Sequence, residues 1–199
     1  FEFIRFVVER KLSKKLALFK MLTSKLSPLF IAYTVCGKLT GKDVVRSKTI
    51  RLLKGIKRGE LLELAGQFYQ SHLQQKEIAD IVQLLKEKQE QKEVWLFSNS
   101  IDPVIQIIAN RLGVQYASSE LEYSSDTTFT GNFKRDLSGK KQEAFFELFP
   151  SNCAIEMMCS DNKSDLEILK LAKEPIVVVY KPADKRFWQS LNPMFIEKF

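Results

Sequence analysis

The chain is poor in the residues that build zinc sites and disulfide frameworks. It has one histidine, His72, and three cysteines, Cys36, Cys153 and Cys159, whose spacing fits no paired metal motif. The odd number of cysteines argues against a disulfide framework, and a reducing compartment is the simplest interpretation. We therefore expect a cytoplasmic protein rather than a small disulfide-stapled secreted domain.

Long apolar runs are also missing. The longest in the N-terminal part, Leu26 to Cys36, is flanked by Lys20, Lys25 and Lys38 and falls short of the roughly 20 residues that cross a bilayer. We predict no transmembrane helix, and Phe1 opens a charged helical stretch rather than a signal peptide. Repeats, low-complexity segments, a glycine-rich or aromatic base platform and helix-turn-helix spacing are absent as well, so no nucleic acid partner is expected.

What the chain does have is enough apolar sequence for a packed core, and a basic N-terminal part. Its 199 residues are 45% apolar, which suits one α/β core with or without a small helical domain. Residues 1–58 hold 15 Lys or Arg against three carboxylates, a net charge of +12, so the remainder sums to −5. Such a surface favours a phosphorylated substrate, acidic lipid or nucleic acid, although a solvated helical face is the alternative.

The apolar pattern changes its period near Lys92. Before it, apolar residues recur every three to four positions, which predicts four to six helices and no strand. After it, short apolar runs alternate with amphipathic segments, which predicts a parallel three-layer α/β core. We therefore expect a helical cap domain at 1–92 and a Rossmann-like core at 93–199. The expected core elements are strands 93–97, 114–116, 154–158 and 176–179, a hairpin over 121–131, and helices 103–112, 140–148 and 165–172.

The first candidate site residue is Ser98, which ends the apolar run from Val94. Ligands of open parallel sheets bind beyond the carboxyl ends of the strands, and a helix start supplies backbone N–H groups for an anion. Ser98 and Asn99 are therefore candidate phosphate-binding residues. The alternative is that Ser98 only ends the strand, while Ser100 or Asp102 caps the following helix.

Two carboxylates and a lysine complete the candidate set. Asp161 and Asp165 follow the strand 154–158 and, four residues apart over a strand-to-helix turn, can face one point as oxygen ligands of Mg²⁺ do. Asp165 could instead simply complement the dipole of the next helix. Lys141, or its neighbour Lys140, starts an amphipathic helix from which an ammonium could neutralise a phosphoryl group in transfer.

The order of these motifs resembles the haloacid dehalogenase superfamily, specifically its phosphoserine-phosphatase-like branch. The resemblance is carried by 94–98 with Asp102-Pro103 and Leu112-Gly113, by 121–131, by Gly139-Lys140-Lys141, and by Ser160-Asp161 through Asp165-Leu166. It extends over 93–185, and the N-terminal helices are similar to the helical cap of that branch.

The resemblance implies a Mg²⁺-dependent phosphomonoesterase that works through an aspartyl-phosphate. Ser98 would hold a phosphoryl oxygen, Lys141 would stabilise charge, and Asp161 would bind Mg²⁺ with support from Asp165. Covalent catalysis of this kind divides one displacement into two easier steps. In the family an Asp-x-Asp pair that precedes the cap supplies nucleophile and general acid. Here Phe1 already matches the first cap helix, so we expect both residues upstream of Phe1 and expect the chain as given to be inactive.

Several alternatives stay open at this stage. A small phosphorylated metabolite is the expected substrate, but Ser160 in place of the usual glycine resembles the phosphatidylglycerophosphate phosphatases of the branch. In phosphoserine phosphatases an arginine binds the carboxylate of phosphoserine, and Thr49 stands at the aligned position here. This argues against phosphoserine as the substrate, unless Arg46 or Arg51 takes over that role. A lipid-headgroup phosphatase at an anionic membrane surface, peripheral at the inner membrane, is therefore one alternative. A catalytically dead phosphate-binding protein is another.

Overall fold

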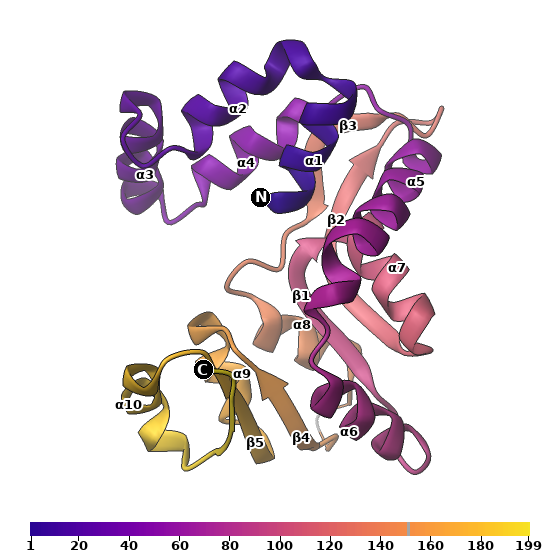
Figure 1. The fold of residues 1–199 in the computed structure, drawn as a ribbon, viewed down its shortest axis with the longest axis vertical. Helices are drawn as coiled ribbons and strands as arrows, with labels where there is room; N and C mark the ends of the chain where they lie inside the picture. Colours follow the sequence, from indigo (N-terminus) through magenta and orange to yellow (C-terminus); the bar gives the residue numbers. More distant parts are fainter. Residues whose placement is uncertain (151) are drawn as a thin grey trace. The chain divides into compact units, whose positions relative to one another are not determined.

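The computed structural model describes residues 1–150 and 152–199, which form two compact units. The first unit is Phe1–Asp136 and the second is Leu137–Phe199, and each is described by itself. Both units combine helices with a three-stranded sheet, as the α/β pattern of the sequence predicts (Figure 1).

Helices make up the first two thirds of the first unit. They are α1 (Glu2–Lys11), α2 (Leu16–Thr23), α3 (Pro28–Thr40), α4 (Val44–Ile50), α5 (Arg58–Phe68) and α6 (Ala79–Gln89). Phe3, Phe6 and Val7 of α1 are buried, and the two phenylalanine rings pack against Phe68 of α5. The three-to-four spacing of apolar residues thus forms the core of this helical layer.

The sheet of the first unit has the order β1-β2-β3. β1 (Trp95–Ile101) runs parallel to β2 (Gln115–Tyr123), and β3 (Phe129–Arg135) closes an antiparallel hairpin with β2. The crossover helix α7 (Asp102–Leu112) packs on β1 and β2, and α5 packs on α7 (Figure 1). Pro103 is the second residue of α7 and Gly113 follows its end with φ +67°, which confirms the start signal to within one residue and the stop signal in the sequence.

The second unit has a parallel sheet of order β4-β5-β6. Its elements are α8 (Lys141–Leu148), β4 (Ile155–Ser160), α9 (Leu166–Leu169), β5 (Ala172–Val179), α10 (Lys185–Trp188) and β6 (Met194–Glu197). Trp188 is fully buried against Leu169, Val177 and Val179. The run of valines in β5 is buried, as expected for a strand covered on both faces.

Three sequence expectations are wrong, and one strand was not predicted. The helix predicted over 165–172 is only a short α9, because Ala172 already belongs to β5, whose first residues are polar and hide the strand. The strand β6 was not anticipated, since its four residues are too few for a period to show. β1 continues through Ile101, beyond the predicted end at Phe97. Cys159, expected to be a buried thiol, is exposed.

The boundary between a cap at 1–92 and a core at 93–199 stays a prediction. The compact units divide the chain after Asp136, so that the predicted cap helices and the hairpin β2–β3 lie in one unit. A backbone bridge between Lys57 and Thr128 and the hydrogen bonds of Gly55 and Ile56 with Phe129 link these parts. The helical layer and the first sheet are therefore held together by main-chain contacts as well as by side-chain packing.

Candidate functional site

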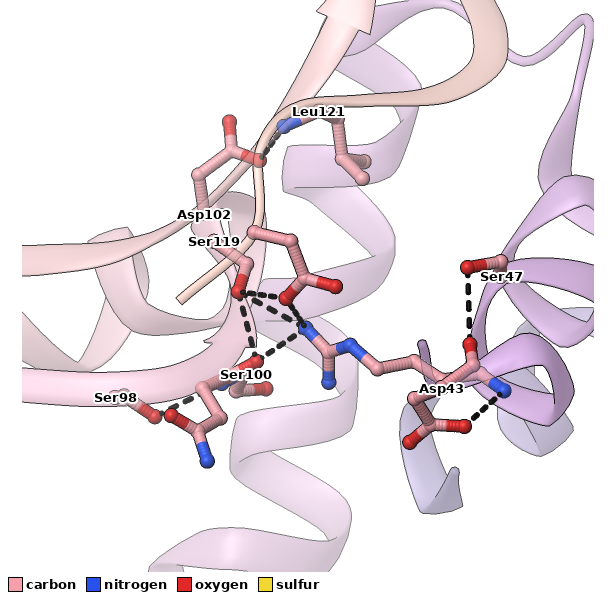
Figure 2. Close-up of polar contacts among 10 residues, drawn as sticks. Asp43, Ser47, Ser98, Ser100, Asp102, Ser119 and Leu121 are labelled. Carbon is pink, nitrogen blue, oxygen red and sulfur yellow. Dashed lines mark hydrogen bonds and ion pairs between the residues drawn. The ribbon is translucent and has the colours of Figure 1, made fainter. Parts of the chain in front are cut away.

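Ser98 lies at the last regular position of the parallel pairing between β1 and β2. It pairs with Ser118, and the register shifts between Ser98 and Ile101. The Ser98 hydroxyl oxygen accepts a hydrogen bond of 3.1 Å from the backbone N–H of Ser100 (Figure 2). The hydroxyl oxygen therefore already accepts from one amide of the strand's irregular part, and its O–H can still act as a donor.

Neither predicted cap residue caps α7. Asp102 lies inside the first turn of the helix, and no side-chain cap is formed at its N-terminus. The Asp102 carboxylate instead accepts a 2.9 Å hydrogen bond from the backbone N–H of Leu121 in β2, as Figure 2 shows. Burial raises the pKa of Asp102, and the bond from Leu121 partly opposes this effect. Asp102 thus ties the helix to the neighbouring strand.

A guanidinium from the helical layer lies beside the end of β1. Arg46 of α4 donates through Nη2 to the carbonyl oxygen of Asn99 at 2.5 Å and to the hydroxyl of Ser119 at 2.9 Å. The same nitrogen is 3.2 Å from a carboxylate oxygen of Asp136, and the side chain is 18% exposed. The guanidinium also stacks on Phe133, with its carbon 4.8 Å from the ring centre. A guanidinium that is paired with the Asp136 carboxylate thus lies where the sequence predicts phosphate binding.

Two polar atoms of this cluster have no partner among the described residues. They are Nε of Arg46 and the side-chain oxygen Oδ1 of Asn99, both buried. A buried polar atom left without a hydrogen bond costs about 1–3 kcal/mol, so such atoms are rare unless a ligand or water completes them. The cluster at the end of β1 therefore retains unused hydrogen-bonding capacity.

In the second unit the structure brings Lys141 and Asp165 together. Nζ of Lys141, at the start of α8, is 2.7 Å from Oδ2 of Asp165, and their side chains are only 11% and 4% exposed. The Ser160 hydroxyl at the end of β4 donates to the same carboxylate oxygen at 2.6 Å. Asp165 therefore holds the ammonium of Lys141 beside the carboxyl end of β4, so the dipole interpretation of this residue is incomplete.

Asp161 lies in the turn that follows β4 and is exposed. Tyr180 directly follows the neighbouring parallel strand β5. Burial, and then the charge of Asp161, raise the pKa of Tyr180. The carboxyl ends of β4 and β5 thus carry an exposed carboxylate and a phenol at the edge where parallel sheets bind ligands.

The side chains at this edge can supply only some of the oxygen ligands that Mg²⁺ needs. Among residues 1–150 and 152–199 no group of three or more His, Cys, Asp or Glu could hold a metal ion. Mg²⁺ is commonly bound by one or two carboxylates, with water and substrate phosphate completing the octahedron. Exposed Asp161 fits a direct ligand. Asp165 has one oxygen occupied by Lys141 and Ser160, and fits a supporting role better.

The candidate residues therefore fall into two groups. Lys141, Asp165 and the neighbouring Asp161 lie at one end of the sheet β4-β5-β6, whereas Ser98 and Asn99 lie within β1 of the other unit, where its regular pairing with β2 stops. The structure describes each group by itself, and their convergence on one ligand stays a prediction. Arg46 and Ser160 were not among the predicted site residues. A signal existed for Arg46, a basic residue near the position of the missing arginine, but a contact across 53 residues has no local pattern.

Comparison with protein-family models identifies the family of this chain. The family model for haloacid dehalogenase-like hydrolases matches residues 1–170. The chain belongs to this family. A search of curated protein sequences gave no significant match.

The family fold is also found in solved structures. A protein of unknown function from Bordetella pertussis Tohama I has a TM-score of 0.68 and 16% identity, covering 91% of this chain and 89% of that one. A probable phosphoserine phosphatase from Vibrio cholerae has a TM-score of 0.66 and 13% identity, covering 98% of this chain but 55% of its own. A substrate-bound phosphoserine phosphatase has a TM-score of 0.57 and 18% identity, covering 98% and 86%. At these identities the likeness shows the fold alone.

Proposed function

We propose that the protein is a Mg²⁺-dependent phosphomonoesterase of small phosphorylated metabolites that works through an aspartyl-phosphate. The observation that carries the proposal is the ion pair between Lys141 and Asp165, both almost fully buried, at the carboxyl end of β4. A buried ammonium held by a carboxylate beside a ligand-binding edge is suited to stabilise negative charge on a transferring group. Membership of a hydrolase family supports the same chemistry.

Each side chain has a proposed role. Ser98 and Asn99 bind a phosphoryl oxygen, and Lys141 neutralises charge that develops between nucleophile and phosphoryl group. Asp161 would hold Mg²⁺ directly and Asp165 would support it. When bound, the ion would neutralise phosphoryl oxygens and orient the group. In this proposal Ser98, Lys141 and Asp161 act on one phosphoryl group.

The nucleophile is proposed to come from a strand outside residues 1–199. β1 and β4 are edge strands of their sheets, and each pairs with one strand only among the described residues. Such edges present unpaired N–H and C=O groups that accept another strand. A carboxylate at the end of that strand would attack phosphorus, the alcohol would leave with a proton from a second carboxyl group, and water would then release phosphate.

Arg46 is proposed to bind a second anionic group of the substrate. Thr49, where the carboxylate-gripping arginine of phosphoserine phosphatases aligns, is fully buried and its hydroxyl donates to the carbonyl of Val45. Arg51 is exposed and contacts Asn132. Arg46 alone of these three reaches the end of β1, and its unpartnered Nε can donate to an anion.

The experiment is hydrolysis of p-nitrophenyl phosphate by the protein with its natural upstream residues. Activity should require Mg²⁺, and Asp161→Asn should abolish it. Asp184→Asn is the matched control, because Asp184 lies in the same unit but pairs with Lys163 on the surface. Absence of turnover in the parent, with retained binding of inorganic phosphate, would favour the catalytically dead alternative instead.

A lipid-headgroup phosphatase is the second candidate. Helix α3 in the predicted cap is apolar, yet none of its residues is buried. This candidate keeps the same chemistry and changes only where the substrate lies. Hydrolysis of a phosphorylated lipid presented in vesicles, compared with a soluble phosphomonoester, separates the two.

A further inference from the structure

Helix α3 exposes a continuous apolar stripe. It has 13 residues, one of them charged, and buries none. Ile31, Val35 and Leu39 are 52%, 51% and 82% exposed. They are spaced four residues apart and therefore lie above one another on one helix face.

The preceding helix continues this exposure. α2 packs against α3 and buries Phe19 and Leu22, whereas Leu18 and Met21 are 43% and 50% exposed. Leu26, between the two helices, is 91% exposed. We call the six exposed side chains the α2–α3 apolar residues: Leu18, Met21, Leu26, Ile31, Val35 and Leu39. Monomeric proteins seldom leave apolar clusters of this kind uncovered unless the cluster binds something.

Along the sequence the charge near these residues is mostly positive, and the nearest carboxylates, Glu9 and Asp43, lie just outside residues 10–42. Residues 10–42 contain eight Lys or Arg and no Asp or Glu. Near the apolar residues these include Lys14, Lys20, Lys25 and Lys38. Two such segments from two copies of the chain would repel each other, which disfavours a dimer through this surface. An apolar surface rimmed by cations is complementary to a bilayer that carries anionic lipids.

We propose that α2 and α3 dock the protein on an anionic lipid bilayer by inserting the α2–α3 apolar residues at the interface while the lysines contact headgroups. Among the described residues no single helix passes the length and hydropathy test for a membrane span, and one bent pair, Ser13–Thr23 with Pro28–Thr40, passes it together. α3 alone is about 20 Å long, against a hydrocarbon core of about 30 Å. A span through both helices would carry Lys20 and Lys25 into hydrocarbon, at high cost.

Docking goes beyond the proposed hydrolase function and does not depend on it. It involves residues of α2, α3 and the segments next to them, none of which is assigned to the candidate site. Loss of hydrolysis in Asp161→Asn should therefore leave docking unchanged, and loss of docking should leave hydrolysis of a soluble ester unchanged. The two proposals can fail separately.

The first measurement is co-sedimentation of the 199-residue chain with vesicles. Vesicles of phosphatidylcholine with about 30% phosphatidylglycerol are compared with pure phosphatidylcholine, because anionic lipid attracts basic segments. We expect binding to the anionic vesicles that weakens at least tenfold in high salt. Equal binding to both vesicle types, or no binding to either, would overturn the proposal.

Matched variants localise the contact. The triple variant Ile31→Ser/Val35→Ser/Leu39→Ser should weaken partitioning at least tenfold. The reversal Lys20→Glu/Lys25→Glu should weaken it about fivefold or more per lysine. Phe146→Ser, which removes an apolar side chain 54% exposed in α8, should leave partitioning unchanged. If the α3 and α8 variants behave alike, the surface is misassigned.

A fluorophore on α3 distinguishes docking at the bilayer surface from a membrane span and from contact with a second copy of the chain. Cys36 is exposed and can be labelled with nitrobenzoxadiazole in a Cys153→Ser/Cys159→Ser background. Anionic vesicles should shift its emission to the blue, with stronger quenching by shallow than by deep lipid quenchers. Strongest quenching at the bilayer centre would indicate a span, and a blue shift that depends on protein concentration without lipid would indicate a second copy. Either result contradicts interfacial docking.

Discussion

The buried pair of Lys141 and Asp165 allows a quantitative test within the second unit. Lys141→Met leaves the Asp165 carboxylate, whose side chain is 4% exposed, with only the hydrogen bond from Ser160 as a strong contact at Oδ2. Breaking a buried ion pair by removing one partner costs about 3–5 kcal/mol, because an uncompensated charge stays buried. We therefore expect Lys141→Met to lower the free energy of unfolding by about 3 kcal/mol.

A double-mutant cycle isolates the pair itself. Asp165→Asn should also destabilise, but the double variant Lys141→Met/Asp165→Asn should cost less than the sum of the two, with a coupling of about 2 kcal/mol. Urea unfolding followed by Trp188 fluorescence in a Trp95→Phe background reports on this unit, since Trp188 lies in its core. The lower stability would be read from the midpoint at unchanged slope.

The matched control is the surface pair of Lys170 and Glu167. These side chains are 48% and 63% exposed at the same 2.7 Å separation. Exposed pairs contribute about 0–1 kcal/mol, so Lys170→Met should change stability by less than about 1 kcal/mol. A coupling below about 0.5 kcal/mol for Lys141 and Asp165, similar to the surface pair, would refute the argument that Asp165 holds the lysine in place.

Three further predictions concern the first unit. Burial raises the pKa of Asp102 in the folded protein. As the pH rises above the unfolded pKa of about 3.9, the unfolded state loses this proton before the folded state does, so the free energy of unfolding falls. The stability of Asp102→Asn relative to the parent should therefore increase from pH 4 to 7, and a constant difference would contradict this. Gly113→Ala should cost about 1 kcal/mol in thermal unfolding because φ is +67°, and Gly59→Ala, without positive φ, is the control. Arg46→Gln should raise KM for a substrate with a second anionic group about tenfold or more but leave KM for an aryl phosphate unchanged; equal effects on both would rule out its proposed role.

The sequence predicts much of this fold because short local patterns determine where most helices and strands begin and end. Helical periodicity before Lys92, Pro103 and Gly113 at the ends of α7, and the hairpin between β2 and β3 are signals within a few residues, and the structure confirms each. The family model confirms the resemblance that the spaced motifs suggested. The four-residue β6 and the polar start of β5 lack such a local signal.

The candidate site depends on contacts that no local pattern encodes. That Arg46 reaches Asn99, or that Lys141 pairs with Asp165 and Ser160, follows from packing across 53 and 24 residues. The sequence placed Asp161 and Asp165 together at one predicted Mg²⁺ site, with Asp165 in support of Asp161. The structure separates them by environment, since one is exposed and the other is buried against an ammonium.

The central claim is that Ser98, Lys141 and Asp161 surround one phosphoryl group. The most direct measurement is a crystal structure of the protein with its natural upstream residues, Mg²⁺ and tungstate as a phosphate analogue. We predict one anion that contacts the Ser98 hydroxyl and the Lys141 ammonium, with Mg²⁺ on the Asp161 carboxylate beside it. Separate cavities for these three side chains, more than about 10 Å apart, would contradict the claim.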